Sequence, residues 1–77
     1  MLDEAKVQDI YEGIILRYAL YAAERRNSRE SEAIFWEIVS HAECIGKILG
    51  YTEAQVTADM RKQLIDMYGE EAVRHER

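Results

Sequence analysis

Three side chains able to bind a metal ion are spaced for one side of a helix, at Glu37, His41 and Cys44. Gaps of four and three residues put the carboxylate, the imidazole and the thiol on one edge, and all three groups ligate zinc. Three ligands on one helix cannot complete the tetrahedral coordination of zinc without a fourth ligand from elsewhere in the protein. In the alternative, His41 lies at the core edge hydrogen-bonded to Glu37, and Cys44 packs as a small apolar residue. We favour that alternative and predict no metal and no cofactor.

The same neighbourhood offers a candidate catalytic pair, because His41 is within helical reach of a nucleophilic Cys44. Two neighbours on one convex helix create neither a cleft nor an oxyanion hole. The sequence also contains no glycine-rich phosphate loop, no G-x-S-x-G and no H-E-x-x-H. We therefore predict a protein that is not an enzyme.

A second spaced pattern, I-[AG]-x-x-L-G-x-[ST]-x-x-x-V, is formed by Ile45, Gly46, Leu49, Gly50, Thr52 and Val56. In it a small residue lets two helices approach, a glycine makes the turn, and the last apolar residue locks the second helix. The segment IGKILGYTEAQVTADMRKQL resembles the helix-turn-helix of the promoter-recognising C-terminal region of bacterial sigma factors and of response-regulator domains. The resemblance covers residues 40–64 only.

This resemblance implies that the helix beginning at Thr52 is a recognition helix in the major groove of DNA. The residues that would face DNA are Gln55, Thr57, Ala58, Arg61 and Lys62, with Arg25, Arg26 and Arg29 as phosphate contacts. The alternative for the arginines is a helix C-terminus followed by a solvated turn. Glu53 and Asp59 lie on the same helix, and the chain's formal charge of -5 opposes attraction to phosphate. DNA binding is therefore our second hypothesis.

Three tyrosines share one side of the first predicted helix, Tyr11, Tyr18 and Tyr21, with Arg25 one turn beyond. Tyrosine and arginine are favoured at interfaces and can stack on a nucleobase. They suggest a third hypothesis, a small-ligand (nucleotide) sponge with its site between subunits. The alternative is an aromatic core whose hydroxyls reach the rim.

These residues need elements to position them, and the chain has no proline and only four glycines. We predict an all-α fold, a single domain over residues 1–77, with helices at about 3–26, 28–49 and 52–68 and a short tail at 70–77. Expected caps are Asn27 with Glu30, and Thr52 with Gln55, while Gly50 and Gly69 end helices. A split near Ser40, where Glu43 completes a capping pair, would make a four-helix bundle. A helix-turn-helix-like unit would occupy residues 40–68.

Apolar residues exceed what one small bundle covers. The second helix has a broad apolar face on which Ile34, His41, Ile45 and Ile48 lie, and Trp36 falls on its polar side. The third helix has a stripe of Val56, Met60, Leu64 and Met67. The first helix is two-sided, so we expect a homodimer. Its interface would use Leu16, Ala19, Leu20 and Ala23, or Trp36.

The acidic balance, 15 carboxylates against 10 bases, favours a basic partner over DNA or an anionic membrane. No apolar run approaches the roughly 18 residues of a membrane span. With one cysteine, a disulfide within the chain is excluded, and we expect a reduced Cys44 in the cytoplasm. We predict a small acidic regulator or inhibitor that binds another protein, of the kind that phages or mobile elements carry.

Overall fold

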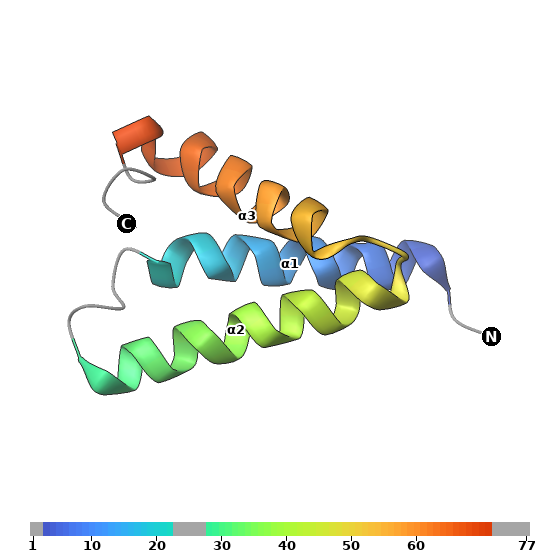
Figure 1. Cartoon of the computed structure of the whole chain (residues 1–77), viewed down its shortest axis with the longest axis horizontal. Helices are drawn as coiled ribbons and strands as arrows, with labels where there is room; N and C mark the ends of the chain where they lie inside the picture. Colours follow the sequence, from blue (N-terminus) through green and yellow to red (C-terminus); the bar gives the residue numbers. More distant parts are fainter. Residues whose placement is uncertain (1–2, 23–27, 72–77) are drawn as a thin grey trace.

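The computed structural model describes residues 3–22 and 28–71, which form three α-helices without a strand. The helices are α1 (Glu4–Ala22), α2 (Arg29–Ile48) and α3 (Glu53–Tyr68). α1 lies between the other two and packs against both, while α2 and α3 diverge from the turn that joins them (Figure 1). The all-α prediction is confirmed. Residues 23–26, which we expected to be helical, lie outside the described part.

The helix ends follow local chemistry at most of the expected positions. The Asp3 side chain accepts a hydrogen bond from the Ala5 N–H at 3.0 Å at the start of α1. Thr52 caps α3 by accepting from the Gln55 N–H at 3.2 Å. Gly50 has a φ of +85°, and the Tyr51 N–H closes the turn by donating to the Gly46 carbonyl at 2.8 Å. The predicted cap at Thr52, the predicted turn at Gly50 and the predicted end of α3 at Gly69 are confirmed.

One local prediction is wrong, and one alternative that the sequence left open is excluded. The cap of α2 is Ser28, whose hydroxyl accepts from the Ser31 N–H at 3.0 Å, and not Asn27 with Glu30. Ser28 serves because a helix takes the side-chain acceptor that lies directly before its first turn. The split that the sequence left open is absent, since Ser40 lies inside the continuous α2. A capping pair in a sequence does not end a helix whose backbone hydrogen bonds and packing continue through it.

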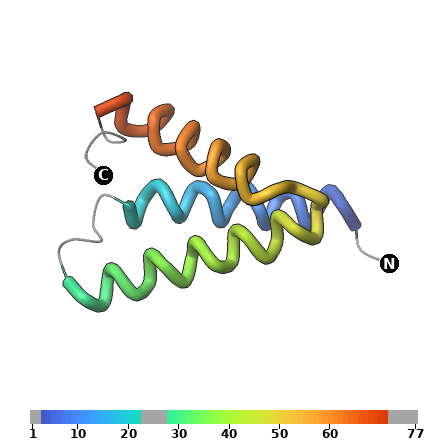
Figure 2. The backbone as a smooth tube through the Cα atoms, in the orientation of Figure 1, coloured from blue at the N-terminus to red at the C-terminus, as the bar shows by residue number. Residues whose placement is uncertain are grey.

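The core consists of two adjoining clusters in which α1 takes part throughout. One contains Tyr11, Ile15, Ala42, Val56 and Met60. The other contains Ala19, Ala22, Phe35 and Leu64. The course of the backbone shows α1 running along both neighbours to supply this shared core (Figure 2). The bundle is therefore organised around α1, which supplies buried residues to both clusters.

Small residues set how closely the helices approach. A Cβ added at Gly46 would lie 2.6 Å from the Val56 Cγ2, closer than real side chains come, so α3 crosses α2 where α2 has only a glycine. Ala19 is fully buried among the residues of the second cluster. The prediction that Ala19 contributes to an interface between copies is therefore wrong, because its small side chain serves helix contact within the chain.

Several apolar-face assignments are also corrected. His41 and Ile48 are exposed, although both were placed on the buried face of α2. Met67 is 36% exposed, so the buried stripe of α3 ends at Leu64. Helix divergence explains Met67, because α2 and α3 separate with distance from their shared turn (Figure 2).

Candidate functional site

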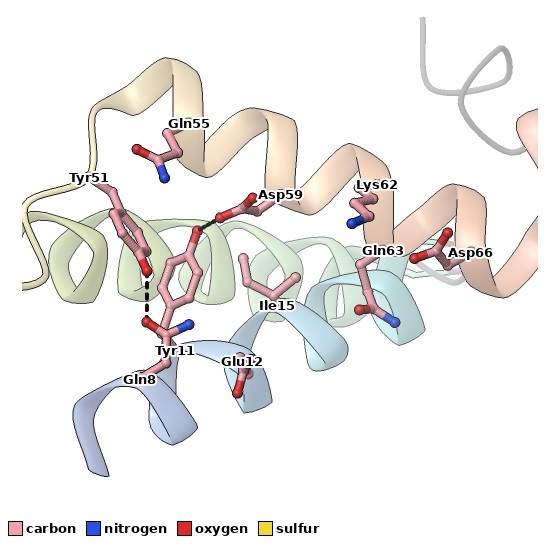
Figure 3. A pocket seen from close by; sticks show the side chains of 10 residues that line it. All are labelled: Gln8, Tyr11, Glu12, Ile15, Tyr51, Gln55, Asp59, Lys62, Gln63 and Asp66. Carbon is pink, nitrogen blue, oxygen red and sulfur yellow. Dashed lines mark hydrogen bonds between the residues drawn. The ribbon is translucent and has the colours of Figure 1, made fainter. Parts of the chain in front are cut away.

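A groove of about 410 Å³ lies between α1 and α3. Its α1 wall presents Gln8, Tyr11, Glu12 and Ile15 (Figure 3). Tyr51, from the turn before α3, stands at one end of it. The α3 wall is formed by Gln55, Asp59, Lys62, Gln63 and Asp66.

Two tyrosine hydroxyls tie the groove walls together. The Tyr11 hydroxyl donates to the Asp59 Oδ2 at 2.7 Å, which joins α1 to α3. The Tyr51 hydroxyl donates to the Gln8 Oε1, also at 2.7 Å, which joins the turn to α1. The two rings pack edge to face, with centroids 5.1 Å apart and planes at 73°. The tyrosines therefore fix the position of α3 against α1.

Burial and the neighbouring carboxylate keep the Tyr11 phenol protonated. Desolvation is the largest cause that raises the pKa of Tyr11 above its ordinary value near 10, and the hydrogen bond to Asp59 adds to it. The Tyr11 hydroxyl is therefore a structural donor at neutral pH and is not poised to accept a proton.

The groove is acidic and rich in amides. Glu12, Asp59 and Asp66 bring three carboxylates, against one ammonium from Lys62. Side-chain amides come from Gln8, Gln55 and Gln63. Such a lining suits cationic, hydrogen-bonding groups and is unfavourable for phosphate.

The five α3 residues predicted to face DNA are all exposed. Gln55 and Lys62 line the groove, whereas Thr57, Ala58 and Arg61 are exposed outside it. Arg29 begins α2, whose 20 residues span about 30 Å and separate it from the turn at the other end. Arg25 and Arg26 lie outside the described residues. The sequence could not show this separation, because it depends on the direction in which α2 runs.

The three candidate metal ligands are exposed to solvent. Glu37, His41 and Cys44 are all exposed. Within residues 3–22 and 28–71, no three His, Cys, Asp or Glu side chains are grouped so that they could hold an ion. The interpretation of His41 as a core-edge residue and of Cys44 as a packed one is wrong, because both side chains are exposed.

The tyrosines proposed for a ligand do not surround one pocket. Tyr11 lines the groove, but Tyr18 packs on Phe35 with ring centroids 5.2 Å apart. Tyr21 is half-buried against the second cluster, and Arg25 is not described. The predicted ligand residues follow one face of α1, whereas the groove is also lined by residues of α3. Spacing along the sequence could not show that α3 lies beside Tyr11.

Among the residues predicted to form a protein interface, the exposed ones lie on two different helices. Leu16 and Leu20 are 44% and 45% exposed on α1, and Trp36 is 53% exposed on α2. The indole packs edge-on against the buried Phe35, with centroids 5.1 Å apart and planes at 79°. Ala23 lies outside the described residues. Ile10, also on α1, is 53% exposed.

Comparisons with protein families, curated proteins and solved structures gave no match. In the part of the chain that the structure describes, none of the helices combines the length and apolar character that crossing a bilayer requires.

Proposed function

We propose that this chain is a small, non-enzymatic regulator that acts by binding another protein, with Trp36 as the anchor of the contact. The observation that carries the proposal is the exposure of the indole, 53%, on a helix whose neighbouring side chain is buried. Tryptophans in such positions are enriched among the few residues that dominate interface energies.

Packing makes Trp36 a preorganised anchor. Phe35 is 2% exposed, and the edge of one ring rests on the other. A side chain held in this way loses little conformational entropy on binding, which strengthens association. The formal charge of -5 favours a partner with a basic surface.

The test is affinity capture of the tagged full-length protein from host lysate, with nuclease, in parallel for the wild type, Trp36→Ala and Tyr68→Ala. Tyr68 is the matched control, an aromatic side chain that is 45% exposed on α3. We expect one protein to be retained in stoichiometric amount by the wild type and Tyr68→Ala and lost with Trp36→Ala. Equal retention by all three would remove Trp36 from the site, and no retained protein would overturn the proposal.

A second candidate, DNA binding, is supported by the local geometry at the turn. Close packing of Gly46 on Val56, the positive φ of Gly50 and the Thr52 cap provide what a helix-turn-helix needs there. This candidate predicts binding that weakens with salt, and a shallower salt dependence in Arg61→Ala. Trp36→Ala would leave such binding unchanged. Titration of a fluorescent duplex with the wild type and both variants separates the two candidates.

A further inference from the structure

A second apolar surface lies along the pair α1 and α2, and Trp36 does not belong to it. Ile10 and Ile48, one from each helix, are 53% and 55% exposed. The same side of the two helices carries four partly buried side chains. We name this surface the α1–α2 face, and it consists of Ile10, Ile14, Tyr21, Ile34, Ile45 and Ile48.

The face lies on the side of both helices that points away from α3. On α1, Glu12 lines the groove with α3, and Ile14 lies about 160° around the helix from it at 100° per residue. On α2, Gly46 meets Val56 of α3, and Ile48 lies about 160° around the helix from it. Since α1 and α2 pack together, these two sides adjoin along their shared seam.

Both helices carry the spacing by which helices pack on further helices. Ile10, Ile14, Arg17 and Tyr21 follow each other at four, three and four residues. On α2 the steps run four, three, four and three through Ile34, Ile38, His41, Ile45 and Ile48. Alternating steps of three and four are the pattern of left-handed helix packing in four-helix bundles. Two such rows side by side are half of a four-helix bundle.

The charges at the edges of the face are of opposite sign. Arg17 lies in the α1 row, and Glu37 borders the α2 row, three residues after Ile34. Both side chains are exposed. Gly46 lies against Tyr11, and Phe35 lies against Tyr18, so α1 and α2 are antiparallel with Arg17 and Glu37 at nearly the same level.

We propose that the α1–α2 face binds a second copy of this chain, forming an antiparallel four-helix bundle about a two-fold axis parallel to α1 and α2. Such an axis preserves the level of every residue and places α1 of one copy beside α2 of the other. Arg17 of each copy then meets Glu37 of its partner, and the pair forms twice. This charge pattern is our reason for choosing a second copy as the occupant. The face has a basic edge and an acidic edge at the same level, so the two-fold axis places each edge against the opposite charge of the other copy.

Sedimentation equilibrium of the full chain tests the proposal. We expect a species of about 18 kDa, twice the 9.0 kDa of one chain. Ile48→Glu should yield the monomer, because a carboxylate would be buried in the apolar contact. Leu20→Glu is the matched control, an exposed leucine outside the face, about 80–120° around α1 from Ile10, Ile14 and Tyr21, and should leave the dimer intact. A monomeric wild type, or a dimer lost with Leu20→Glu and kept with Ile48→Glu, overturns the proposal.

A charge exchange tests the orientation and does not depend on how Ile48→Glu folds. Arg17→Glu and Glu37→Arg each place like charges together twice, and should raise the dissociation constant about tenfold at low salt. The double variant Arg17→Glu/Glu37→Arg should return it to within about twofold of the wild type. A double variant as weak as the singles overturns the two-fold arrangement. Circular dichroism of each variant shows whether the helices remain intact.

Discussion

The two sides of α1 meet their neighbours through different chemistry. On the α3 side the contact opens into a groove in which Tyr11 and Tyr51 form directional hydrogen bonds. On the α2 side the contact borders an apolar face that leaves Ile10 and Ile48 more than half exposed. Directional bonds fix one geometry within the chain, whereas an uncovered apolar surface favours association. The polar side of α1 helps to define the fold, and its apolar side is the one that we propose for association.

The largest expected effect tests whether apolar packing between α1 and α2 carries the stability. Phe35→Ala removes a side chain that is 2% exposed at the centre of the second cluster. We expect a loss of about 3–5 kcal/mol in the free energy of unfolding, enough to unfold much of a domain of this size. Trp36→Ala, one residue away, should cost less than about 1 kcal/mol. Urea unfolding followed by circular dichroism measures both, and similar losses would contradict the assignment of Phe35 to the core and Trp36 to the surface.

An intermediate effect is expected where the three helices meet. Gly46→Ala would place a Cβ 2.6 Å from Val56, a stiff β-branched side chain. We expect a net loss of roughly 1–2 kcal/mol, because crowding outweighs the gain of about 1 kcal/mol in helix propensity.

Gly13→Ala is the matched control for that change, since nothing lies within 4 Å of its added Cβ. It should raise stability by about 0.5–1 kcal/mol. Thermal unfolding of the two variants should therefore shift the melting temperature in opposite directions. A rise in both would mean that α3 can move away from α2 at little cost.

The smallest effect concerns the polar side. Tyr11→Phe removes the donor to Asp59, for an expected loss of about 1 kcal/mol at neutral pH. Tyr51→Phe, which loses only a bond to a neutral amide, should cost about half as much.

The Tyr11 bond also predicts a pH dependence. The pKa of Tyr11 is raised in the folded chain, so the unfolded chain releases this proton first. The contribution is fully present below pH 10 and is lost as pH rises above it, by up to about 1.4 kcal/mol per unit. Urea unfolding at pH 8 and pH 11 should show a steeper loss for the wild type than for Tyr11→Phe. Parallel losses would mean that the phenol is not linked to folding.

Much of the local structure was predictable, because it depends on neighbours in sequence. Thr52 and Gln55 stand three residues apart, and a glycine follows Leu49, so the start of α3 and the end of α2 followed from capping and backbone freedom. The cap at Ser28 was missed because several polar residues compete before α2. The local sequence therefore contains several possible caps, and the path of the backbone determines which of them is used.

The candidate sites were less predictable because they join residues distant in sequence. Tyr11 and Asp59 lie 48 residues apart, and no spacing rule connects them. His41 and Ile48 fell within an apolar arc on α2, but an arc that covers half a helix does not show which part the neighbours cover. Arg17 and Glu37 could be proposed as a pair only because the structure shows that α1 and α2 are antiparallel and that the two residues lie at nearly the same level.

The sequence by itself determined an all-helical chain, the turns at Gly50 and Gly69, the cap at Thr52 and an acidic surface with more apolar residues than a small core buries. These features follow from backbone freedom, local hydrogen bonds and net charge, none of which requires a partner in space. Only the tertiary structure decided that α1 is central, that Ala19 is buried and that the groove and the α1–α2 face lie on opposite sides of α1. The physical reason is that burial is a property of pairs of helices, and the rotation of each helix about its axis is set by packing.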